Sequence, residues 1–216
     1  MKKFIKSCYD KKNFGIRLCI VVAAIITMGF SLSFLLLINL GTDPCTMLNA
    51  AVSRRLGMSF GNWQALMNCI LLFVVVFFGA RNLGFGTLVN VFLTGYAIDF
   101  FTWLWNQILP MEIFEIMWVR VAILFPALIL FVLSAAFYMV VDLGTAPYDA
   151  IPYVISMRLP NVPFRTVRMI FDFSVIAIAY LFGGTFGIVT ILMAFTIGPA
   201  IGWLGSFIET HTKLLS

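Results

Sequence analysis

Charged side chains are scarce in this chain, and histidine is almost absent from it. Of its 216 residues, 11% are charged, 62% are hydrophobic and one is a histidine. An ordinary soluble domain is about a quarter charged, and a soluble fold of this size could not bury so much apolar surface in one core. The composition therefore argues against a soluble protein and predicts an integral membrane protein, whose first partner is the lipid bilayer.

The residues that usually carry catalysis or hold metals are also missing. The four cysteines form no Cys-x-x-Cys pair, and the lone His211 stands near the C-terminus, so the sequence offers no metal site. It contains no Ser-His-Asp set, metalloprotease motif or nucleotide-binding glycine loop. We therefore expect no enzymatic activity and no cofactor. We also expect no nucleic-acid binding, because no soluble part exists to present a basic face.

Long apolar runs are what the sequence has in abundance. Each of six runs has roughly the length needed to cross a hydrocarbon core of about 30 Å. We expect a single membrane domain over residues 1–216, folded as an all-α polytopic bundle of transmembrane helices. The runs are Leu18–Leu40, Asn62–Gly79, Gly84–Trp105, Val119–Val141, Val167–Phe182 and Gly187–Ile208.

The chain contains two copies of one unit. Residues 14–105 align without a gap on residues 117–208, a shift of 103 residues, and the matches include Gly, Thr, Pro and Arg positions. The best stretch pairs Leu-Gly-Thr-Asp-Pro, ending at Pro44, with Leu-Gly-Thr-Ala-Pro, ending at Pro147. Each repeat predicts one long helix, this turn, a short helix and two further long helices.

The short segments 44–56 and 147–159 decide the symmetry of the repeats. Glycine breaks the preceding helix and proline suits the first position of the next one. Thirteen helical residues reach only about 20 Å, so we favour a re-entrant or interfacial helix over a crossing one. Three crossings per repeat would then turn the second repeat upside down, as in many secondary transporters. If the short segments do cross, eight helices and parallel repeats result.

Positive charges favour the six-helix alternative without settling it. The net charge is +5, and five lysines precede Asn13, which predicts that the N-terminus lies in the cytoplasm. The C-terminus then also lies there, and Arg81 falls on the same side. Arg54 and Arg55 would lie outside, against the rule. The eight-helix alternative repairs these two but places Arg81 outside.

The motifs resemble those of the YczE/YitT group of bacterial membrane proteins. The likeness rests on Gly41-Thr42-Asp43-Pro44, on Gly84-Phe85-Gly86-Thr87-Leu88-Val89-Asn90, and on Gly95 with Asp99. Gly144-Thr145-Ala146-Pro147-Tyr148-Asp149 is similar to the group's Gly-x-x-Pro-Trp-Asp signature, with Tyr148 in place of Trp. Cys45 and Thr46 replace the aromatic and the acid in the first repeat. The resemblance implies a multi-pass protein of the bacterial inner membrane rather than a particular activity.

The two turns are the first candidate site. Asp43 and Asp149 are predicted to cap the short helices or lie in their first turn, and they are alternatively ligands for a cation or proton. The free amides that follow Gly41 and Gly144 are candidates to bind an anionic group of a substrate. Thr42 and Thr145 belong to the same two turns.

The second group of candidates lies within the long helices. Asp172 follows Arg168 by four residues, so the two share a helix face and form either a structural ion pair or a gated carboxylate. Asn68 and Asn90 are mid-helix amides that either join helices or line a cavity. We expect Asp99 to be interfacial. The glycines predicted to permit close helix packing are Gly84, Gly86, Gly95, Gly198 and Gly202.

Two classes of function remain. The first is a small secondary transporter or permease, whose site for an unidentified small solute lies between the repeats. The second is an accessory or regulatory membrane protein that binds another membrane protein without a transport cycle. A homo-oligomer is compatible with either function.

Overall fold

The computed structural model describes residues 13–78 and 83–211, and it is helical throughout apart from turns and short connections. The predicted repeat sets the helix boundaries: α5 and α9 begin and end 103 residues apart. In chain order the elements are α2 (Phe14–Ile38), α3 (Pro44–Leu56), α4 (Phe60–Phe77), α5 (Phe85–Ile108), the 3₁₀ turn η1 (Met111–Glu115), α6 (Met117–Val140), α7 (Pro147–Arg158), α8 (Phe164–Leu181) and α9 (Ile188–His211).

The protein is an integral membrane protein. Five helices of the described residues, α2, α4, α5, α6 and α9, are long and apolar enough to cross a membrane. The sixth predicted span is present as α8, which has 18 residues. It does not join the five because Arg165, Arg168 and Asp172 lie within it. Its charge content sets it apart from the other long helices.

The two repeats run in opposite directions. Their first helices, α2 and α6, pack against each other at the centre of the bundle. Arg17, near the start of α2, donates from Nη1 to the carbonyl oxygen of Val141 at the end of α6, at 2.8 Å. At the other end of α2, the ring of Phe34 lies 6.5 Å from that of Phe114, just before α6 begins. The pair is therefore antiparallel, as the inverted-repeat hypothesis predicts.

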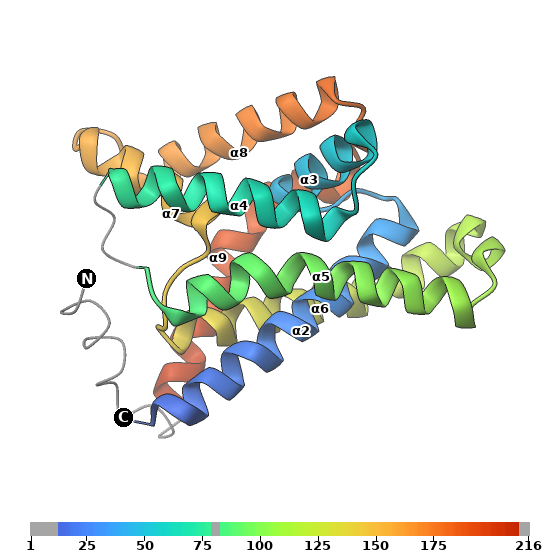
Figure 1. Ribbon diagram of the computed structural model, residues 1–216, viewed down its shortest axis with the longest axis horizontal. Helices are drawn as coiled ribbons and strands as arrows, with labels where there is room; N and C mark the ends of the chain where they lie inside the picture. Colours follow the sequence, from blue (N-terminus) through green and yellow to red (C-terminus); the bar gives the residue numbers. More distant parts are fainter. Residues whose placement is uncertain (1–12, 79–82, 212–216) are drawn as a thin grey trace.

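Each short helix re-enters the bundle from one end and leaves by the same end (Figure 1). The extended segment after α2 runs inward before α3 turns back, and α7 does the same from the opposite end (Figure 1). Asp43 is the N-cap of α3 and accepts from the amide of Thr46 at 3.0 Å, with Pro44 in the first helical position. Gly41 and Gly144 adopt φ values of +107° and +115°, which favour glycine. The re-entrant prediction is confirmed for both segments.

The Leu-Gly-Thr-x-Pro turn of each repeat packs on the last long helix of the other repeat. A Cβ on Gly84 would lie inside 3.0 Å of the carbonyl oxygen of Leu143, and a Cβ on Gly187 would meet Leu40 in the same way. The amide of Gly86 donates to the carbonyl oxygen of Leu143 at 2.8 Å. Thr87 donates from Oγ1 to a carbonyl oxygen of that turn at 2.8 Å. The repeats are therefore interlocked at two symmetry-related places, and glycine is required there by space.

Asp99 has a contact that the sequence did not predict, and the prediction for two glycines needs correction. The Oδ2 atom of Asp99 accepts from the amide of Gly61 at 2.8 Å, so a carboxylate from α5 caps the N-terminus of α4. The interfacial position of Asp99 stays a prediction. Gly198 and Gly202 do not mark a close helix contact within the described part of the chain, because a Cβ built on either meets no atom within 4 Å beyond its own chain neighbours and helix backbone. Gly95 does, since such a Cβ would lie 2.8 Å from the Cα of Gly61.

Candidate functional site

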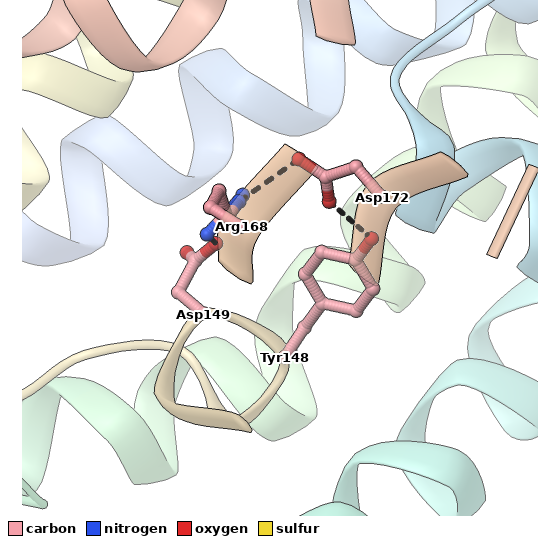
Figure 2. Close-up of polar contacts among 4 residues, drawn as sticks. All are labelled: Tyr148, Asp149, Arg168 and Asp172. Atoms are coloured by element: carbon pink, nitrogen blue, oxygen red, sulfur yellow. Dashed lines mark hydrogen bonds and ion pairs between the residues drawn. The ribbon is translucent and has the colours of Figure 1, made fainter. Parts of the chain in front are cut away.

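An ionic cluster joins the two helices that follow the second turn. The first turn of α7 carries Tyr148 and Asp149, because the chain turns at Gly144 and the helix starts at Pro147. The facing helix α8 carries Arg168 and Asp172, four residues apart on one face. Figure 2 shows Arg168 between the two carboxylates, with the hydroxyl of Tyr148 directed at Asp172.

Arg168 bridges the two carboxylates with separate nitrogen atoms. Its Nη1 lies 2.7 Å from Oδ1 of Asp149, and its Nε lies 2.9 Å from Oδ2 of Asp172. Tyr148 donates its hydroxyl to Oδ1 of Asp172 at 2.8 Å. Both oxygens of Asp172 are thus satisfied, as a side chain that is only 6% exposed requires. Asp149 is 46% exposed, so the cluster has a closed end and an open end.

The other short helix, α3, packs against α8, the helix that carries Arg168 and Asp172. Asp43 caps the N-terminus of α3, and Cys45 lies in its first turn. Both re-entrant helices therefore pack on α8, the helix that carries two members of the cluster, although α3 and α7 enter from opposite ends of the bundle (Figure 1).

Two buried side-chain oxygen atoms of α3 and its N-cap lack a hydrogen-bond donor among the described residues. They are Oδ1 of Asp43 and Oδ1 of Asn49. Asn49 is 0% exposed, and its amide nitrogen reaches Sγ of Cys45 at 3.5 Å. The amide group of Asn49 therefore lies beside Cys45, one turn closer to the start of α3. An unpartnered buried acceptor is costly unless a ligand or ion supplies the missing contact.

The cluster belongs to the second repeat alone. The four positions 103 residues earlier carry no charge: they are Cys45, Thr46, Ala65 and Cys69. The fold is therefore close to symmetric, whereas the chemistry at its centre is not. All four cluster positions thus differ in chemistry from their counterparts in the first repeat. A comparison of the two repeats on this point could have identified Tyr148, which was not among the predicted site residues.

The structure brings some of the predicted site residues together and gives others different surroundings. The ion pair between Arg168 and Asp172 is confirmed. Asp149 joins it through a bond between α7 and α8 that helix periodicity could not predict. Asp43 caps α3 by accepting from the amide of Thr46, so one amide at the start of this helix already has a carboxylate partner. Gly41, Thr42, Gly144 and Thr145 form the interlocked turns, and Asn68 and Asn90 are buried in α4 and α5.

Two open grooves described in the structure lie elsewhere, on outward faces of the bundle. One follows α8 and is lined by apolar and small polar side chains, among them Ile170, Phe173 and Ser174. The other follows α5 and is lined entirely by apolar surface around Phe92. Both suit contact with lipid chains, and neither includes a residue of the ionic cluster.

Comparison with known proteins gives a family for this chain. Residues 15–206 match the model of DUF6198, a family of unknown function. The chain belongs to this family. Family membership covers both repeats and the whole ionic cluster, but it brings no activity with it.

Two curated relatives share most of the chain's length. A protein of Haemophilus influenzae, described as uncharacterized, is 27% identical over 184 residues, which cover 84% of this chain and 80% of that protein. The uncharacterized protein YyaS of Bacillus subtilis is 26% identical over 189 residues, covering 87% and 90%. No solved structure matches. The likeness of this DUF6198 member to the YczE/YitT group in particular stays a prediction.

Proposed function

We propose that this DUF6198 protein is a small secondary transporter of the bacterial inner membrane, with both termini in the cytoplasm. The observation that carries the proposal is the convergence of two re-entrant helices, one from each inverted repeat, on the cluster around Arg168. Inverted repeats with broken helices that meet at a charged centre are a recurrent transporter architecture. The substrate site would lie at this centre, between α3, α7 and α8.

The chemistry of the centre also supports a transport role. An ionisable group in hydrocarbon is costly, by about 2.5–3.5 kcal/mol for a central Asp on the insertion scale. A purely structural bundle would lose little by replacing Arg168, Asp149 and Asp172 with apolar side chains, because a buried ion pair is weak evidence for stability. A role in binding and releasing a ligand would explain why these ionisable residues are present despite the unfavourable free energy of placing them in hydrocarbon.

In the proposed cycle, one repeat rocks against the other around the central pair α2 and α6. The interlocked turns at Gly84 and Gly187 would hold the ends of the repeats together. The cluster would face alternate sides as the bond between Arg168 and Asp149 breaks and forms, because this bond joins the separate helices α7 and α8. The bond between Arg168 and Asp172 lies within α8 and would persist.

The test is solute flux into vesicles that contain the purified protein. A broad panel of small organic solutes and ions is offered to protein-containing vesicles and to empty ones. We expect uptake of at least one solute, abolished by Asp172→Asn and kept by Glu112→Gln. Glu112 makes the same acid-to-amide change at an exposed position in η1. Equal flux into protein-free and protein-containing vesicles, for every solute of the panel, would overturn the proposal and favour the accessory role.

A further inference from the structure

The packing of α3 and α7 on α8 brings together more negative than positive charge. These helices and the N-cap of α3 carry three carboxylates, those of Asp43, Asp149 and Asp172, whereas the guanidinium of Arg168 binds two of them. The N-terminus of each short helix adds roughly half a positive charge. About one negative charge is then left uncompensated among the described residues, in a place where charge is poorly solvated.

The unpartnered oxygen atoms lie at the part of this centre that Arg168 does not reach. Arg168 binds Asp149 and Asp172 directly, whereas Oδ1 of Asp43 and Oδ1 of Asn49 are buried without a donor. Asp43 is the N-cap of α3 and Asn49 lies in its second turn, and α3 packs against α8, which carries Asp172. The excess charge and the missing contacts therefore point to one place, on the α3 side of the cluster.

We propose that this place is a binding site for one monovalent cation, held by Oδ1 of Asp43, Oδ1 of Asn49 and the negative field of Asp172. The proposal builds on the proposed transport function by giving that site a ligand of stated charge. Oxygen atoms without a donor suit an alkali ion, which takes oxygen ligands, and equally an ammonium group, which brings N–H donors. A divalent cation would exceed the charge to be compensated.

The asymmetry of the repeats agrees with a single cation site. In the second repeat, Ala146 and Pro152 stand 103 residues after Asp43 and Asn49. Neither side chain can offer an oxygen ligand. The first repeat therefore supplies the proposed cation ligands, and the second repeat supplies the ionic cluster. The two repeats would move relative to each other during alternating access.

The test measures thermal unfolding of the purified protein in detergent, so it needs no gradient and no transport cycle. Li⁺, Na⁺, K⁺, ammonium and methylammonium are each compared with N-methyl-D-glucamine at equal ionic strength. We expect at least one to raise the Tm, by roughly 5–10 °C at about a hundred times its Kd. A response to alkali ions alone identifies a metal ion, and a response to ammonium and methylammonium alone identifies a cation that binds through N–H donors.

Variants tie the response to the proposed ligands. Asp43→Asn is expected to raise the apparent Kd at least about tenfold, since it removes a charged contact. Asn49→Ala should weaken binding less, and Glu112→Gln should leave it unchanged. Asn49→Ala keeps every charge, so it carries the test if Asp43→Asn does not fold.

Three outcomes would overturn the cation site. In the first, no cation shifts the Tm of the wild-type protein. In the second, Asp43→Asn responds as the wild type does. In the third, infrared spectra show a protonated carboxyl that disappears in Asp43→Asn, which would mean that a proton compensates the charge. Vesicles that transport a solute while no cation binds would refute this inference and leave the proposed function standing.

Discussion

Substituting Gly84 with alanine tests the interlock of the repeats most directly. The backbone of Gly84 is extended, with φ of −159°, a conformation that any residue adopts, so alanine brings no backbone strain. Its Cβ, however, would lie inside 3.0 Å of the carbonyl oxygen of Leu143. The two segments must then separate, which overpacks the interface and weakens the 2.8 Å bond from the Gly86 amide.

The magnitude follows from these two effects. Overpacking costs about 1–3 kcal/mol, and a lost hydrogen bond costs about 1 kcal/mol more. A total of about 2–4 kcal/mol corresponds to a Tm lower by roughly 4–16 °C for a chain of this size. Tryptophan fluorescence during heating in detergent is a suitable measurement, because the chain has five tryptophans.

Gly202→Ala is the matched control. Gly202 lies within α9, where a Cβ would meet no atom within 4 Å, so the change should be neutral or slightly stabilising. If Gly84→Ala and Gly202→Ala unfold within about 2 °C of each other, the close approach between the repeats is absent and the interlock must be abandoned.

Three further predictions concern the same architecture. Thr87→Val removes the hydroxyl that bonds to the other repeat's turn and should lower the free energy of unfolding by about 1–2 kcal/mol. Thr196→Val, which removes a hydroxyl that bonds within α9, should not lower it. Asp99→Asn should weaken the cap of α4 by about 1 kcal/mol, and a stability equal to wild type would show that this carboxylate is not needed there. Single cysteines at Met58 and Asn161, in a background without the native cysteines, should react with an impermeant thiol reagent from opposite sides of the membrane, and labelling from one side would exclude inverted repeats.

Most of the fold could be predicted because its signals are local and repeated. The Leu-Gly-Thr-x-Pro stretch ends one helix and starts another in both repeats, so α3 and α7 were predicted with their starts at Pro44 and Pro147. The antiparallel pairing followed from counting three crossings per repeat. Only the composition of α8 departs from the expected pattern, since the charges that form the site make this helix less apolar than the others.

The site itself could be predicted only where its contacts lie within one helix. Arg168 and Asp172 are four residues apart and pair as their spacing indicates. Asp149 and Tyr148 reach them across a gap between two helices, and no periodicity of the sequence encodes that distance. Asp99 illustrates the same limit, because its partner Gly61 lies 38 residues away on a neighbouring helix.

The exchanged contacts between turns and helix starts have a consequence for biogenesis. Leu40 and Gly41 leave the ribosome early, but the residues that cover them, Gly187 and Thr190, are among the last to be made. The first half must therefore wait in the bilayer with an uncovered polar turn while most of the chain is synthesised. Completion of the bundle is a late event, and a chain truncated before α9 would present this turn to quality-control proteases.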